Sequence, residues 1–238
     1  SNMSLWAVIF LVILTDNALA QYKPFVQETG LNLEDRTFLL NYHNTYRSLI
    51  ALGKGYKDTL TAANMNRLVW HDSLAATAQK HASNCTGPSH DKESNRMPTA
   101  THFKTVGQNL MDCSRTEDCA TAAMANFVVE GKGFDYSLVG KSDYCDESKN
   151  VAGTCGHYLQ LIWATTGYVG CAYDKCTGKG VFARLVCNYG EAGNYRNQVP
   201  FIAGPVCSQC ESHRGFCLEG LCMGQVQKDL IKDAALKA

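Results

Sequence analysis

Apolar residues recur at helical spacing in three stretches of the chain. The first begins after Asn32, whose side chain can cap a helix and which is followed closely by acidic residues, and it continues to Gly53. The second follows Asp72 or Ser73, either of which can cap it, and the third spans about residues 118–130. Because apolar side chains three and four residues apart share one face of a helix, these patterns predict three amphipathic helices.

Two shorter apolar stretches predict strands. They cover residues 168–173 and 181–187 and are separated by a glycine-containing turn. Residues 84–105 and 131–154 are polar and show no periodicity. We expect both of these segments to be long loops.

The first twenty residues have the pattern of a secretory signal peptide. Ten apolar residues, 5–14, precede Ala18-Leu19-Ala20, a small-x-small sequence that a signal peptidase accepts. These ten residues rise about 15 Å as a helix, less than the ~30 Å hydrocarbon core of a membrane. We therefore expect a secreted, extracellular protein that starts near Gln21 and has no transmembrane anchor.

The rest of the chain divides near Gly204, where a Gly-Pro linker occurs. We expect a signal peptide over residues 1–20 and a main domain over residues 21–203. A cysteine-rich hinge over residues 204–222 is too small for a core of its own, and residues 223–238 form a polar tail.

Composition agrees with export. The 238 residues include 12 cysteines, too many for ordinary intracellular thiols, and an oxidising compartment converts them into as many as six disulfides. The 22 basic residues balance the 22 acidic ones. This neutrality removes the electrostatic case for binding nucleic acid or a strongly anionic membrane surface.

Five short motifs occur along the chain in the order of one known family. They are His43-Asn44-x-x-Arg47, then 68–72 (LVWHD), 107–110 (GQNL), 156–163 (GHYLQLIW) and 186–189 (VCNY). Together they resemble the CAP superfamily of cysteine-rich secretory, antigen 5 and pathogenesis-related proteins, and most closely its venom-allergen-like or antigen 5-like branch. The resemblance implies an α+β fold, an α-β-α sandwich with a three-stranded antiparallel sheet, followed here by the short disulfide-rich hinge.

The resemblance also implies a cavity in which two histidines and two acidic residues meet. The histidine of the fourth motif is His157, and Glu130 fits the family's acidic position after the third helix. Gln108 stands where the other glutamate is usual. For the second histidine, which lies in the long loop, we choose His90 over His102.

These residues are suited to holding a metal more than to catalysis. Neutral imidazoles of His90 and His157 can bind a divalent cation such as zinc, but two ligands supply only half of a tetrahedral shell, so binding is expected to be weak. Gln108 removes one base that a hydrolase would use. The alternative to a metal site is a structural pair, in which a histidine hydrogen-bonded to Glu130 orders the cleft without any chemistry. We therefore expect no required cofactor and no enzyme activity, and a metal-dependent hydrolase is the least favoured reading.

Disulfide pairing is implied by the same resemblance. It suggests a bridge between the two predicted strands, a bridge from the second helix to the strand turn, and a crossed pair in the hinge: Cys171–Cys187, Cys85–Cys176, Cys207–Cys217 and Cys210–Cys222. The pairing of the other four cysteines stays open, and our working assignment is Cys113–Cys119 and Cys145–Cys155.

Several members of the family bind sterols or fatty acids, so a lipid channel between the first helix and the helix ending at Glu130 is expected. The residues that these helices offer as channel walls are Leu39, Tyr42, Tyr46, Ile50, Met124 and Phe127. Apolar walls suit a lipid, but ordinary core residues have the same composition.

The expected function is that of a secreted, non-enzymatic CAP protein that binds a sterol or fatty acid at the extracellular or host interface. The alternative is a protein ligand of receptors or immune components that uses the loops 84–105 and 131–154 as its recognition surface. A further feature is Asn84-Cys85-Thr86, an acceptor sequence for N-glycosylation.

Overall fold

The computed structural model describes residues 30–56, 59–85, 89–99, 103–114, 119–140, 144–145, 154–176 and 182–224. The predicted signal peptide and nearly all of the predicted tail lie outside these residues. No helix in the described part of the chain is long and apolar enough to cross a membrane.

The three predicted helices are present as α2 (Leu33–Ala51), α3 (Asp72–Ala82) and α5 (Cys119–Val129). At the start of α2, the Asn32 side chain accepts a hydrogen bond from the backbone of Asp35, and the Asp35 carboxylate accepts one from the backbone of Asn32. This capping box confirms the predicted start. The predicted cap of α3 was wrong: Asp72 and Ser73 lie inside the helix, and its N-cap is His71, which makes no side-chain capping bond.

The predicted loops contain short helical turns that apolar periodicity could not reveal. Residues 84–105 include α4 (Glu93–Arg96), and η1 (Glu130–Lys132) and η2 (Tyr136–Leu138) lie at the start of the other loop. One further helix, α6 (Gly156–Leu161), follows it.

The described residues form one main sheet with the strand order β1-β3-β4-β2. Its strands are β1 (Val69–Trp70), β2 (Val106–Cys113), β3 (Tyr168–Lys175) and β4 (Ala183–Gly190). The three long strands are antiparallel, as expected. We expected three strands, and the described sheet has a fourth. The added strand is the two-residue β1, which precedes α3 in the chain and pairs in parallel with β3.

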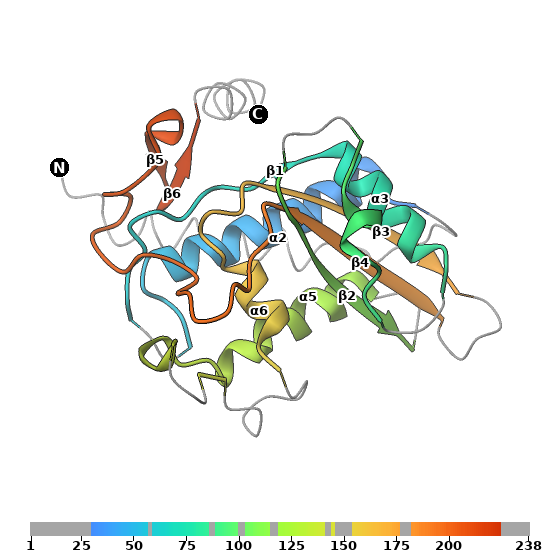
Figure 1. The fold of residues 1–238 in the computed structure, drawn as a ribbon, viewed down its shortest axis with the longest axis horizontal. Helices are drawn as coiled ribbons and strands as arrows, with labels where there is room; N and C mark the ends of the chain where they lie inside the picture. Colours follow the sequence, from blue (N-terminus) through green and yellow to red (C-terminus); the bar gives the residue numbers. More distant parts are fainter. Residues whose placement is uncertain are drawn as a thin grey trace.

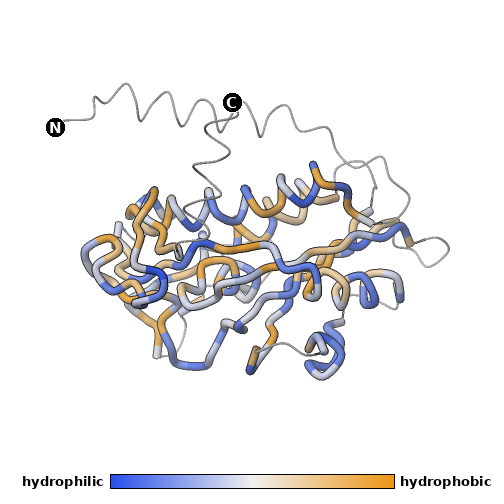
Figure 2. Tube along the Cα trace, turned by 90° about the horizontal axis from the view of Figure 1, so that it is seen from above, coloured by the Kyte–Doolittle hydropathy of each residue, from blue (hydrophilic) through white to orange (hydrophobic). Residues whose placement is uncertain are grey.

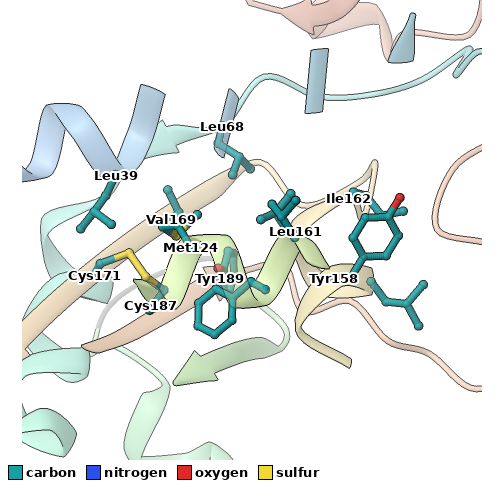
Figure 3. Close-up of a cluster of buried hydrophobic side chains, with 14 of the residues drawn as sticks. Leu39, Leu68, Met124, Tyr158, Leu161, Ile162, Val169, Cys171, Cys187 and Tyr189 are labelled. Atoms are coloured by element: carbon teal, nitrogen blue, oxygen red, sulfur yellow. A yellow bond between two sulfur atoms is a disulfide. The ribbon is translucent and has the colours of Figure 1, made fainter. Parts of the chain in front are cut away.

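Helices cover both faces of this sheet, as the resemblance implied (Figure 1). Side chains alternate between the faces of a strand. Val186 of β4 packs with Ala78 and Ala82 of α3, whereas its neighbour Cys187 belongs to the larger cluster formed with α2, α5 and α6. Figure 2 shows hydrophilic and hydrophobic residues alternating along the helices and strands. Figure 3 shows members of the larger cluster on α2, α5, α6, β3 and β4, namely Leu39, Met124, Leu161, Val169 and Tyr189.

Arg47 fixes α2 against the chain around α6. Its guanidinium is fully buried, and burial lowers its pKa to about 9. It donates hydrogen bonds of 2.6–3.2 Å to backbone carbonyls of Asn66, Leu161, Trp163, Ala164 and Thr166. Because these carbonyls come from segments far apart in the sequence, one buried side chain holds α6 in place.

All six expected cysteine pairs are disulfides in the structure. They are Cys85–Cys176, Cys113–Cys119, Cys145–Cys155, Cys171–Cys187, Cys207–Cys217 and Cys210–Cys222. Each bridge stabilises the fold by about 2–4 kcal/mol, mainly by restricting the unfolded chain.

The cysteine-rich hinge packs on the body of the protein. It contains β5 (Phe216–Leu218) and β6 (Leu221–Met223). Leu221 is fully buried in the larger apolar cluster, and the backbone N–H of Cys222 donates to the carbonyl of Met65. The hinge therefore shares the core of the main domain, and the boundary near residue 204 remains a prediction.

Candidate functional site

Glu130 and His157 form the more buried half of the candidate site. Glu130 begins η1, directly after α5, and its side chain is fully buried. Its Oε1 lies 2.6 Å from Nδ1 of His157. Its Oε2 accepts hydrogen bonds from the backbone N–H groups of His157 at 3.0 Å and Tyr158 at 3.2 Å. The carboxylate therefore caps the first turn of α6 while it orients the imidazole, and negative charge is favourable at a helix N-terminus.

The same contact determines which nitrogen of His157 can bind a ligand. A carboxylate oxygen accepts hydrogen bonds, so Nδ1 of His157 carries the proton and Nε2 carries the lone pair. Phe127 stacks on the ring with centroids 4.7 Å apart, and the His157 side chain stays 26% exposed. Proteins use this carboxylate–imidazole arrangement to orient metal ligands.

His90 and Gln108 form the second half of the site. Nδ1 of His90 lies 3.0 Å from Oε1 of Gln108, which is on β2. The Gln108 Nε2 group donates to Oδ1 of Asp91 at 3.1 Å and to Oδ1 of Asn188 at 3.0 Å. Since both N–H groups of the amide have acceptors, its oxygen faces His90 and accepts the Nδ1 proton. The lone pair of His90 is therefore on Nε2, as in His157.

The amide at position 108 is matched to its neighbours. Asp91 and Asn188 both present oxygen atoms to the Gln108 Nε2 group. A glutamate would place a carboxylate oxygen against the Asp91 carboxylate, and like charges at this distance repel. The departure from the family's usual residue thus fits the local hydrogen bonding.

The two imidazoles are close enough to influence each other. His90 is exposed in part, and the burial of the rest of its side chain is the main cause that lowers its pKa. The hydrogen bond with Gln108 acts in the opposite direction and raises the pKa. Positive charge on Arg96 and on protonated His157 lowers the pKa of His90 further. The lowered pKa keeps His90 neutral at pH 7, the form that binds metals.

A separate chain of hydrogen bonds supports His157 through the sheet. Nδ2 of Asn109 donates to the backbone oxygen of His157 at 3.0 Å and to the Tyr189 hydroxyl at 3.2 Å. The Tyr189 hydroxyl lies 2.8 Å from Nε2 of His43, whose Nδ1 lies 2.7 Å from the carbonyl oxygen of Leu39. Because a carbonyl only accepts, Nδ1 of His43 is protonated, and the Tyr189 hydroxyl donates to Nε2 of His43.

Burial keeps this chain uncharged. Desolvation lowers the pKa of His43 to about 4 and raises the pKa of Tyr189 above its usual range. Both groups are therefore neutral at pH 7, and every bond of the chain has one donor and one acceptor. A neutral, satisfied network of this kind costs little to bury.

The structure brings the four expected site residues together as two pairs, Glu130 with His157 and His90 with Gln108. His102, the other histidine of the loop, lies outside the described residues. The sequence reasoning assigned no role to Asn109, although it belongs to a motif that carries the resemblance. The signal that could have identified it is a polar residue inside a buried strand.

The residues expected to line a lipid channel form a closely packed core. The four most buried are at most 4% exposed, and two tyrosines pack against the same cluster: Leu39, Ile50, Met124 and Phe127, with Tyr42 and Tyr46. A cavity beside Ile50 has a volume of about 10 Å³, enough for roughly one water molecule. Their role in ligand binding stays a prediction.

Comparison with known proteins agrees with this geometry. Residues 40–189 match the model of the cysteine-rich secretory protein family, CAP. The chain is 36% identical over 185 residues to Venom allergen 5 2 of Polybia paulista, covering 74% of this chain and 83% of that protein. It is 34% identical over 206 residues to CRISP/Allergen/PR-1 of Trittame loki, covering 81% of this chain and 49% of that longer protein.

The fold has solved counterparts as well. The crystal structure of NaASP2 with Zn²⁺ superposes with a TM-score of 0.63 at 26% identity, over 84% of this chain and 99% of that one. The family match includes β1, β2, β3, most of α2 and of β4, all of α3, α5 and α6, and the four residues of the candidate site. The chain therefore belongs to the CAP, or cysteine-rich secretory protein, family.

Proposed function

We propose that this chain is a non-enzymatic binding protein that acts outside the cell. Its relatives include a protein named as a venom allergen. The pairing of all 12 cysteines in six disulfides fits an oxidising compartment, and the apolar segment followed by Ala18-Leu19-Ala20 supports export.

The hydrogen bonds of Glu130 carry the non-enzymatic part of the proposal. Both of its oxygens are engaged with His157 and with the first turn of α6. A general base needs a lone pair directed at a substrate or a water molecule, and the Glu130 side chain is fully buried and makes three hydrogen bonds to His157 and Tyr158. Gln108 is an amide and does not transfer protons at neutral pH.

The orientation of the imidazoles supports weak binding of a divalent cation such as zinc. Nε2 of His90 and Nε2 of His157 would be the ligands, and solvent or a solute would complete the shell. A cation bound there would supply a local positive charge that could receive an anionic group. The solved relative NaASP2 with Zn²⁺ makes zinc the first ion to test.

Zinc titration by calorimetry tests this part. We expect saturable binding in the parent protein and a loss of at least about tenfold in affinity in His90→Ala and in His157→Ala, since each removes one of two ligands. His213→Ala is the matched control, because His213 is exposed on the hinge and pairs with Glu211. Unchanged zinc affinity in both site variants would overturn the proposal.

The helix pair α2 and α5 supports the second part, binding of a sterol or fatty acid. Small buried residues, Ala120 and Ala123, lie in the same apolar cluster as Leu39 and Phe127. Because Leu39, Met124 and Phe127 are buried in this cluster, an acyl chain would enter only as the two helices separate. An apolar ligand would then replace contacts between side chains with contacts to itself.

Titration with labelled sterol and labelled palmitate tests this part. We expect saturable binding of one of them and its loss in Ala123→Leu, which fills space between the helices. Ala125→Leu is the control, because Ala125 is exposed on the same helix. Absence of saturable binding of both lipids would eliminate the lipid proposal and leave the metal proposal standing.

A further inference from the structure

A large polar pocket lies between α3 and the segment that contains α4. Its volume is about 650 Å³, within the range of about 300–1,000 Å³ that is usual for sites of small molecules. One wall is α3 with the residues at its C-terminal end, and the other wall lies within residues 91–99, which include α4.

The lining offers hydroxyl, amide and ammonium groups to which the described residues give no partner. Within the described part of the chain, six lining side chains form no hydrogen bond or ion pair: Ser73, Lys80, Asn84, Ser94, Asn95 and Thr99. The Asp91 carboxylate is neutralised by Arg96 at 2.8 Å. Ala76, Met97 and Pro98 add small apolar surfaces. Such a lining suits a ligand rich in hydroxyl and acetamido groups with little charge.

The sequence places an attachment point for such a ligand in this pocket. Asn84 lines it, is exposed, and begins the acceptor sequence Asn84-Cys85-Thr86. Proline is the residue that the middle position excludes, so Cys85 is compatible with modification. The Cys85–Cys176 disulfide then ties the residue next to Asn84 to the end of β3, which fixes the attachment point relative to the pocket.

We propose that Asn84 carries an N-linked glycan whose first N-acetylhexosamine residues occupy this pocket. The proposal rests on the proposed secretion, because the modification takes place in the secretory pathway. The glycan donor is a lipid-linked oligosaccharide pyrophosphate. Nδ2 of Asn84 forms a bond to the anomeric carbon, the bond from that carbon to the pyrophosphate oxygen breaks, and the amide loses one proton as the lipid pyrophosphate leaves.

The seated glycan would bridge the two walls of the pocket. Ser73 and Lys80 face it from α3, and Ser94, Asn95 and Thr99 face it from the other side. The bridged segment also contains Asp91 and follows His90, so the glycan holds the loop that supplies the second imidazole. Ordering of a loop by such contacts slows the local opening that permits amide hydrogen exchange.

The test uses the full chain produced in a eukaryotic secretory host, with Asn84→Gln and Thr86→Ala as variants without the acceptor sequence. Thr86→Ala keeps Asn84 itself and is the sharper comparison. A third protein combines Thr86→Ala with Val199→Thr, which moves the acceptor sequence to Asn197, an exposed residue outside the pocket. Peptide mass spectrometry measures glycan occupancy, and hydrogen exchange is measured over residues 91–99.

We expect the parent to carry a glycan on Asn84 and its amides in residues 91–99 to exchange about tenfold more slowly than in Thr86→Ala. The protein with the glycan on Asn197 is expected to exchange like Thr86→Ala. Secretion with Asn84 unmodified, or an occupied Asn84 without slower exchange, would overturn this proposal and leave the proposed function intact. Failure of the chain to enter the secretory pathway would overturn both.

Discussion

The two halves of the site are supported from opposite faces of one sheet. Gln108 and Asn109 are consecutive on β2, as are Asn188 and Tyr189 on β4, so within each pair the side chains point to opposite faces. One set of hydrogen bonds lies on the face covered by α3, and we call it the α3-face network: His90, Gln108, Asn188 and Thr77. On the other face, the α2-face network consists of Glu130, His157, Asn109, Tyr189 and His43.

The networks differ in charge and in the elements that carry them. The α2-face network contains a fully buried carboxylate, and its imidazole, His157, is on a helix. In the α3-face network, the group that contacts the His90 ring is the neutral amide of Gln108, and His90 lies in a loop before α4. A cation bound between the two networks would therefore contact one rigid ligand, His157, and one adjustable ligand, His90. Removing the buried charge of Glu130 should destabilise the α2-face network, and this should be the largest effect.

Glu130→Gln is expected to have the largest effect. The amide replaces one acceptor oxygen by an N–H group that faces donors, so buried N–H groups of α6 or of His157 lose their partner. Loss of a buried, charged acceptor costs about 3–5 kcal/mol. Urea denaturation measures this as a lower free energy of unfolding. Glu34→Gln, in the exposed first turn of α2, serves as the control, and an equal loss in both variants would contradict the assigned role of Glu130.

Acid is expected to weaken the α2-face network next. The pKa of His43 is lowered to about 4 from 6.5, so the unfolded chain binds a proton before the folded one. The stability that neutral His43 contributes is complete above pH 6.5 and is lost as the pH falls toward 4, by about 3 kcal/mol in total. Urea denaturation at several pH values measures the slope. The slope should be shallower in His43→Gln, and an unchanged slope would show that another group is responsible.

Gln108→Glu tests the α3-face network and is expected to cost about 1–2 kcal/mol at pH 7, since it sets a carboxylate against Asp91 and the Asn188 oxygen. Those neighbours raise the pKa of the new carboxyl above its unfolded value. The deficit should therefore shrink as the pH falls and the group is protonated. Gln209→Glu, at an exposed position of the hinge, should stay within about 0.5 kcal/mol of the parent at every pH. A deficit that grows on acidification would refute this description of Gln108.

Periodicity predicted α2, α3 and α5, whose exposed positions recur along one face, and apolar runs predicted β3 and β4, but the sequence pattern missed β2 and α6. α2, α3 and α5 each keep one polar face, so their spacing is visible in the sequence. β2 is buried along most of both faces and contains Gln108 and Asn109, so no alternation marks it. α6 is only six residues long, too short for a periodic pattern.

The members of the site could be predicted by resemblance, but their arrangement could not. Motifs identified His157 and Glu130, and the choice of His90 depended on context in a loop without periodicity. The tautomers depend on contacts with Gln108 and Glu130, which lie 18 and 27 residues from their partners in the sequence. Local sequence does not determine such contacts, because the packing of α4 against β2 and of α6 against η1 creates them.

The central claim is that opposite faces of the sheet hold both site imidazoles with the proton on Nδ1 and the lone pair on Nε2. Long-range ¹H–¹⁵N correlation spectra of the histidine rings, recorded on the metal-free protein well above pH 7, report this directly. The account predicts Nδ1–H tautomers for His90 and His157, with the His157 assignment lost in Glu130→Gln and that of His90 retained. A proton on Nε2 of either ring in the parent protein would contradict it.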